Sequence, residues 1–129
     1  MKRNILTVLL LAFCAVLLNS TAWADTKGMD MSEQCRDACV KTLNYLQKQG
    51  GKQAQTTRID ALRDCIKLCD TNVDLAKRNS PLLAQVEKVC ADACKRCAAL
   101  CEGVNDPQLK ECAAMCNHCA NSCEMHHSN

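Results

Sequence analysis

Composition and charge set the first limits on this chain of 129 residues, which contains 13 cysteines but one Trp, one Tyr and one Phe. The formal net charge is +2, without the clustered basic excess that nucleic acid or an anionic membrane surface would require. The sequence therefore predicts neither of those partners. A core with so few aromatic side chains must be built from aliphatic residues and cysteine, and a bound metal would be a second source of stability.

The first 24 residues are predicted to be an export signal. Lys2 and Arg3 precede an apolar run over residues 5–18, which is too short for a comfortable membrane span. Residues 22–24, Ala-Trp-Ala, then offer a small-x-small cleavage site. We expect the mature protein to be exported, to the periplasm, and to have no membrane segment once the signal is removed.

Residues 25–129 are predicted to form a single all-α domain. Asp30 and Glu33 have the spacing of a capping box, and Ser80 and Asp106 each precede a proline that suits the first position of a helix. With Gly50-Gly51, Asn79 and Gly103 as stops, the expected helices cover residues 31–49, 57–78, 81–103 and 107–126. No segment has the alternation of a β-strand. Because the linkers are short, the helices should form an up-down-up-down antiparallel four-helix bundle.

Twelve cysteines of this domain form six Cys-x3-Cys pairs, while the thirteenth, Cys14, lies in the export signal. In the last two helices, two pairs join as C-x3-C-x2-C-x3-C. Steps of four, three and four residues return to one face of an α-helix, so the thiols form stripes that coincide with the apolar faces. The pairs are Cys35/Cys39, Cys65/Cys69, Cys90/Cys94, Cys97/Cys101, Cys112/Cys116 and Cys119/Cys123.

Three uses of these thiols compete with metal storage. Buried cysteines can act as small hydrophobic residues, but twelve in register exceed what packing requires. An exported protein with an even cysteine count can be a disulfide scaffold. Bridges within one pair are disfavoured because Cβ atoms at i and i+4 lie about 5–6 Å apart, whereas a disulfide needs about 3.5–4.5 Å. Bridges between facing helices stay open, as does an iron–sulfur cluster, since C-x3-C-x2-C also occurs on a loop of radical S-adenosylmethionine enzymes.

The fourth use is the binding of many soft cations. Thiolates suit Cu(I), which accepts two or three sulfurs, whereas a structural Zn(II) site needs four ligands at tetrahedral corners. Bridging thiolates would let twelve cysteines hold on the order of a dozen Cu(I) ions. We therefore favour Cu(I) storage, with a disulfide-stapled interaction module and a general Zn(II) or Cd(II) scavenger as alternatives. No catalytic arrangement stands out, so we do not expect an enzyme.

The cysteine-rich half of the chain also resembles a known family. Its sequence is CADACKRCAALCEGVNDPQLKECAAMCNHCANSC, and it is preceded by CRDAC and CIKLC. This pattern resembles the copper storage proteins, which are cysteine-rich four-helix bundles that hold Cu(I) inside. The resemblance implies a thiolate-lined core, several Cu(I) ions bound by the twelve cysteines, and a homo-oligomer; it names no copper donor or recipient.

The first two helices carry only half of the full stripe. Extending the spacing along the first helix reaches Thr42 and Leu46, and along the second it reaches Leu62 in one direction or Asn72 and Ala76 in the other. We expect an apolar, copper-poor plug where these two helices meet.

Methionine and histidine residues gather at the opposite end of the predicted bundle. Met29 and Met31 lie at the start of the first helix, and Met125, His126 and His127 lie at the finish of the fourth. In an up-down-up-down bundle these two places are neighbours. Thioether and imidazole groups can bind Cu(I) and release it more readily than buried thiolates do. We expect Met31, Met125 and His126 to pass copper into or out of the core.

Overall fold

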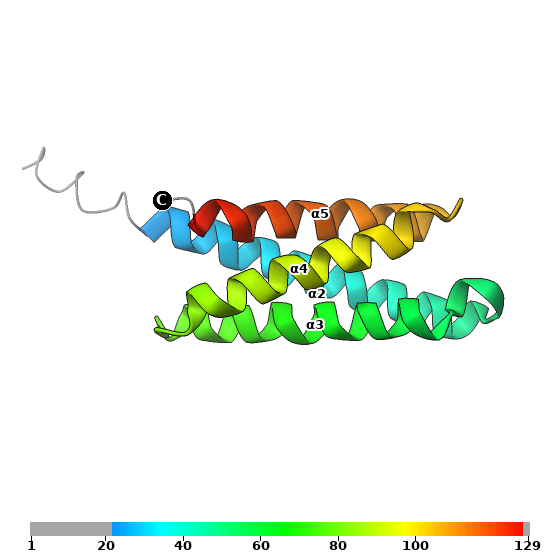
Figure 1. Cartoon of the computed structure of the whole chain (residues 1–129), viewed down its shortest axis with the longest axis horizontal. Coiled ribbons are helices and arrows are strands. Elements are labelled where there is room, and N and C mark those ends of the chain that lie inside the picture. The colour runs from blue at the N-terminus through cyan, green and yellow to red at the C-terminus, as the bar shows by residue number, and fades with distance from the viewer. Residues whose placement is uncertain (1–21, 128–129) are drawn as a thin grey trace, which may run out of the picture.

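The computed structural model describes the backbone of residues 22–127 and the side chains of residues 31–126. Four long helices lie along a common direction (Figure 1). The elements are α2 (Ala22–Gln49), the short 3-10 helix η1 (Gly51–Ala54), α3 (Thr56–Lys77), α4 (Leu83–Glu102) and α5 (Pro107–His127). The described part of the chain contains no strand, and no helix in it is long and apolar enough to cross a membrane. The export signal remains a prediction.

Each helix contacts two neighbours around the bundle: α2 with α3, α3 with α4, α4 with α5, and α5 with α2. This arrangement confirms the predicted four-helix bundle. We call the end where α2 begins and α5 ends the terminal end, and the opposite end, where α2 meets α3 through η1, the η1 end (Figure 1).

Two predicted helix starts are wrong. Helix α2 begins at Ala22 rather than at residue 31, so Asp30 lies inside the helix and does not cap it. The residues before Asp30 include no proline, and the one glycine among them weakens a helix without stopping it. Helix α4 begins at Leu83, because Pro81 and Leu82 form a turn. Ser80 still caps this turn, since its Oγ accepts a hydrogen bond from the backbone N–H of Leu82 at 3.3 Å.

Two other predicted helix ends are confirmed by their hydrogen bonds. Asn79 has a φ of 50°, and the N–H of Ser80 reaches the carbonyl of Leu75 at 2.9 Å, which is the geometry of a Schellman stop. At the start of α5, the Oδ1 atom of Asp106 accepts from the backbone N–H of Leu109 at 3.1 Å. These ends fix the axial positions of the cysteine stripes on α3 and α5.

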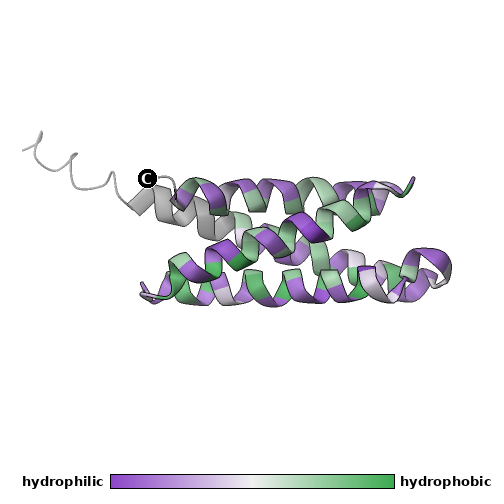
Figure 2. Ribbon diagram, viewed as in Figure 1, coloured by the Kyte–Doolittle hydropathy of each residue, from purple (hydrophilic) through white to green (hydrophobic). Residues whose placement is uncertain are grey.

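The core consists mainly of sulfur and small side chains. Hydrophilic and hydrophobic residues alternate along each helix, as expected for amphipathic helices around a narrow interior (Figure 2). The core contains all twelve cysteines of the described chain, with Leu46, Leu62, Leu109, Ala61, Ala91, Ala98, Ala113 and Ala120. Few large apolar groups are buried, so the thiols occupy positions that leucine or phenylalanine would fill in an ordinary bundle.

Candidate metal centre

The twelve cysteines of the described chain are all free thiols, and none is more than 3% exposed. They come from all four helices, and the stripe spacing turns each one toward the bundle axis. The structure thus brings together every cysteine that the sequence identified as a metal ligand. Their burial excludes water from the site.

Sulfur atoms meet across the diagonals of the bundle as well as between neighbouring helices. The Sγ atoms of Cys35 on α2 and Cys94 on α4 are 3.8 Å apart, and those of Cys65 on α3 and Cys116 on α5 are 4.0 Å apart. The Sγ atoms of Cys65 and Cys94 are 3.4 Å apart. A disulfide bond is about 2.05 Å long, so these are contacts between separate thiols. The centre of the bundle is therefore a column of sulfur.

Four groups of thiols are close enough to hold an ion, because the Sγ atoms within each group lie within 4.8 Å of one another. Cys35, Cys39, Cys116 and Cys119 each belong to two groups, so neighbouring groups share sulfurs. Shared thiolates can bridge two soft ions. The groups are Cys35/Cys69/Cys94/Cys119, Cys35/Cys39/Cys65/Cys116, Cys39/Cys97/Cys112/Cys116 and Cys90/Cys119/Cys123.

Hydrogen bonds between thiols give individual sulfurs different acidities. Hydrogen bonding to Cys116 and other neighbours, together with burial, raises the pKa of Cys35. Three other thiols shift in the opposite direction, because hydrogen bonds from neighbouring thiols stabilise their thiolate form and lower their pKa. These thiols, each with its main hydrogen-bond partner, are Cys65 with Cys116, Cys112 with Cys101, and Cys119 with Cys123. Each of the four groups contains one of these three acidic thiols.

Toward the terminal end, the next stripe position on every helix holds a polar residue. These residues are Ser32, Asn72, Glu87 and His126, and we call them the polar ring. The first three are at most 6% exposed. The Nδ1 atom of His126 lies 3.0 Å from Oε1 of Glu87, so an ion pair can form when the imidazole is protonated. Ser32 and Glu87 were not predicted as site residues, although one further step of three residues beyond Cys35 and Cys90 reaches them.

The predicted copper-passing residues lie at the terminal end but differ in exposure. Met31 is half-buried, and Met125 is 62% exposed. The side chain of His126 is 34% exposed where it meets Glu87. The side chains of Met29 and His127 lie outside the described residues. An accessible methionine and histidine thus stand outside the buried thiols, as a passage would require.

The η1 end is closed by apolar side chains. Leu46, Leu62 and Leu109 are fully buried, as is the polar Thr42, and Val104 is partly buried and packs against the core cluster. Beyond these positions, no helix has a further cysteine along its stripe at this end. The predicted apolar plug is therefore present.

Polar groups seal the rim of the same end. The hydroxyl of Tyr45 donates to Oδ2 of Asp106 at 2.6 Å, which lowers the pKa of that carboxyl. Arg58 is 8% exposed, and its guanidinium donates to the carbonyls of Leu100, at 2.9 Å, and Gln53. These bonds tie α2 to the start of α5, and α3 to the end of α4.

Comparisons with known proteins agree with this architecture. BsCsp3, a copper storage protein whose structure contains Cu(I), is 22% identical with a TM-score of 0.76, over 79% of this chain and 96% of its own. Apo-Csp3 from Bacillus subtilis is 22% identical with a TM-score of 0.72, over 78% of this chain and 95% of its own. The Nmul_A1745 protein from Nitrosospira multiformis is 25% identical with a TM-score of 0.78, over 84% of this chain and 98% of its own.

The sequence itself assigns the family. No curated protein matches the chain. Residues 19–128 match the family model of the copper storage proteins, Csp, which covers all four helices and every cysteine of the core. The chain belongs to the copper storage protein family.

Proposed function

We propose that this protein stores several Cu(I) ions as a thiolate cluster inside its four-helix bundle. The observation that carries the proposal is the column of twelve buried thiols, eleven of which lie in groups that share sulfurs. Membership of the copper storage family and the Cu(I) bound in the structural neighbour BsCsp3 support the same cargo. The residues proposed to bind the ions are the twelve cysteines.

Charge favours Cu(I) over a divalent metal in this core. Burying an unpaired charge is costly, so the bound cations should cancel the charge of the thiolates. One Cu(I) per thiolate gives a neutral core. A tetrahedral Zn(II) site with four thiolates would instead leave two negative charges in each buried group. The described core contains no Lys or Arg at the thiols to offset such a charge, since Arg58 bonds to carbonyls at the η1 end.

An anaerobic titration tests the storage function directly. Cu(I) is added to the protein in the presence of a chromophoric Cu(I) chelator, and the bound ions per chain are counted. We expect several ions, up to about one for each of the twelve thiols. Zn(II) or Cd(II) in excess should not displace them. Binding of only one or two ions per chain would contradict storage.

We infer that copper enters and leaves at the terminal end. Met31, Met125 and His126 offer thioether and imidazole donors there, and Glu87 beside His126 adds a carboxylate. Replacing the Met31, Met125 and His126 side chains together should slow Cu(I) loading and leave the capacity unchanged. Leu82→Ala is the matched control, because Leu82 is 54% exposed at the same end and has no donor atom. Unchanged loading rates in the triple variant would exclude this passage.

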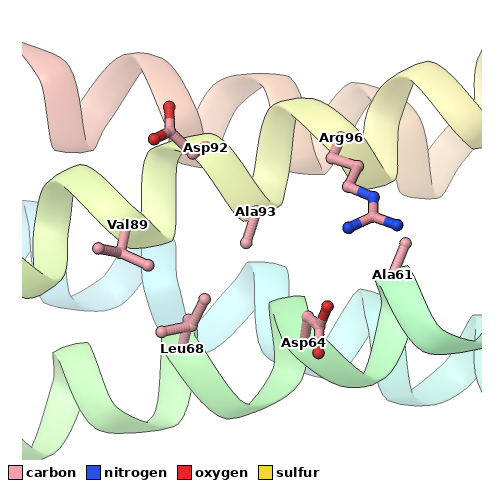
Figure 3. A pocket seen from close by; sticks show the side chains of 7 residues that line it. All are labelled: Ala61, Asp64, Leu68, Val89, Asp92, Ala93 and Arg96. Carbon is pink, nitrogen blue, oxygen red and sulfur yellow. The ribbon is translucent and has the colours of Figure 1, made fainter.

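A groove between α3 and α4 supports the proposed homo-oligomer. Its volume is about 250 Å³, and Figure 3 shows Asp64 and Arg96 reaching into the gap between the two helices. The lining residues are Ala61, Asp64, Leu68, Val89, Asp92, Ala93 and Arg96. Because acidic and basic groups share one apolar patch, a second copy related by a two-fold axis can place its Arg96 against Asp64.

Sedimentation velocity tests this interface. Val89 is 52% exposed on the groove, so Val89→Glu should bury a charge between the copies and shift the protein toward the monomer. Val40→Glu is the control, since Val40 is 39% exposed on α2, away from the groove. Equal sedimentation of the wild type and Val89→Glu would place the interface elsewhere.

We propose further that the protein works after export, in the periplasm. The support is the basic start, the apolar run and the Ala-Trp-Ala site of residues 1–24. Cell fractionation and N-terminal sequencing should find a periplasmic protein that begins at Asp25. A cytoplasmic protein that retains residues 1–24 would contradict the proposal.

A further inference from the structure

Two buried polar side chains face the outermost thiols from the helices whose cysteine stripes stop early. The Oγ atom of Ser32 on α2 lies 3.9 Å from the Sγ atom of Cys119 on α5. The amide Nδ2 of Asn72 on α3 donates to the same Oγ at 2.9 Å. We propose that Ser32 and Asn72 form a hydrogen-bond relay that controls the exchange of Cu(I) at Cys119. This inference rests on the proposed storage function.

Cys119 occupies the junction between the outer and inner thiols. It belongs to the outer group with Cys90 and Cys123 and to the inner group with Cys35, Cys69 and Cys94. An ion that moves from one group to the other can therefore keep its bond to the Cys119 sulfur throughout. A group that acts on this sulfur acts on the transfer step.

The amide of Asn72 sets the direction of the relay. Because Asn72 donates its N–H to the Ser32 oxygen, the single O–H of Ser32 is left to donate elsewhere. A thiolate at Cys119 has no proton, so Ser32 must be the donor in the Ser32–Cys119 contact once copper binds there. Ser32 and Asn72 thus act as positioning residues, through Cys119, and do not need to touch the ion.

A hydrogen bond to a metal-bound thiolate weakens its hold on the ion. The bond draws electron density from the sulfur and stabilises the free thiolate after the ion has left. The outer group also has three thiols, whereas the other groups have four. Ser32 and Asn72 occupy the stripe positions where α2 and α3 would otherwise supply further cysteines. The outer group is therefore built for exchange and the inner groups for retention.

The second amide atom of Asn72 indicates that stability alone does not explain this residue. Its Oδ1 is buried and has no hydrogen-bond partner among the described residues, and Asn72 as a whole is 3% exposed. An unpaired buried carbonyl destabilises the folded state, and an apolar residue of the same size would avoid that cost. A destabilising group that is hydrogen-bonded to Ser32, which itself contacts Cys119, is what a functional role predicts.

The test measures Cu(I) release from the fully loaded protein. Wild type, Ser32→Ala and Asn72→Leu are loaded anaerobically, mixed with excess chromophoric chelator and followed by stopped flow. We expect the fast phase, from the outer ions, to slow by about tenfold in Ser32→Ala, the size expected for losing one hydrogen bond to a charged sulfur. Asn72→Leu should slow the fast phase less, because the Ser32 hydroxyl remains but its O–H is no longer oriented toward Cys119 by the amide. Copper capacity should stay unchanged in both variants.

A buried hydroxyl at the other end provides the matched control. Thr42 is fully buried on the same helix, donates to the carbonyl of Ala38 and accepts from Gln108. Thr42→Val should leave the fast phase unchanged. Equal slowing in Thr42→Val and Ser32→Ala, or wild-type release in Ser32→Ala, would overturn the relay. Thermal denaturation should show Asn72→Leu to be at least as stable as wild type; a large loss would give Asn72 a structural role instead. If wild type itself loads only one or two ions, storage fails rather than the relay.

Discussion

The two ends of the bundle follow the same residue spacing and carry opposite chemistry. One step beyond the last thiol, the terminal end has Ser32, Asn72, Glu87 and His126. The corresponding step at the η1 end reaches Thr42, Leu62, Val104 and Leu109. A single helical period therefore places polar groups over one opening of the thiol column and mostly apolar groups over the other. This difference is the basis for the proposal that copper enters and leaves at the terminal end.

The two ends of the bundle should also contribute differently to the stability of the protein. The leucines at the η1 end supply the large apolar side chains that the thiol column lacks, so that end should dominate the stability of the copper-free protein. The terminal end buries polar groups, one of them unpaired, and should open more readily. Bound copper would then stabilise the terminal end most, because that end is the less stable one in the copper-free protein.

Copper loading should produce the largest change in stability. Each site adds about 2.7 kcal/mol when free ligand is a hundredfold above its Kd, so several ions should raise the thermal midpoint by tens of degrees. Amide hydrogen exchange locates the gain. Protection should increase most in α5 around Cys119 and Cys123 and least around Leu46 and Leu62. A uniform increase along all helices would remove the proposed contrast between the ends.

Truncating the plug should cause the next largest effect. Leu62 is fully buried at the η1 end, so Leu62→Ala should lower the free energy of unfolding of the copper-free protein by about 2–5 kcal/mol. Copper capacity should not change, because no thiol is lost. Urea denaturation and the Cu(I) titration measure the two quantities. Exposed Leu82→Ala serves as the control and should change the unfolding energy little.

Much of this contrast was visible in the sequence, because it depends on period. Helical spacing alone placed the thiols on inward faces, and its continuation through Thr42, Leu46 and Leu62 predicted the plug that the structure shows. The fold class followed from caps and short linkers. These features are local, so neighbouring residues determine them.

The features that sequence reasoning missed depend on distant partners or on weak boundaries. Glu87 is a buried acid beside a thiol stripe, and its pairing with His126 joins residues on two different helices. Ser32 gains a role only when α3 brings Asn72 and α5 brings Cys119 to it. The start of α2 was misplaced because a capping pattern near residue 30 does not end a helix that can continue backward.

Cysteines near the two ends should differ in their effect on copper capacity. Cys119 belongs to two thiol groups, whereas Cys101 belongs to none of the four. Cys119→Ser should therefore remove about two ions and Cys101→Ser about one or fewer, since a hydroxyl is a poor ligand for Cu(I). The anaerobic titration counts the loss. Equal losses would mean that the ions occupy the column evenly, without a distinct outer group.

The smallest expected effect concerns the polar rim of the η1 end. The hydrogen bond from Tyr45 lowers the pKa of Asp106 in the folded protein, so the ionised carboxylate stabilises the fold. A depressed pKa contributes stability above the ordinary carboxyl value, about 3.9, and the contribution is lost as the pH falls through the folded-state pKa. Tyr45→Phe should therefore be less stable than wild type at neutral pH, by less than Leu62→Ala, and the gap should shrink in acid. Urea denaturation of the copper-free protein at both pH values measures this gap; a gap that is the same in acid would assign the role of Tyr45 to packing.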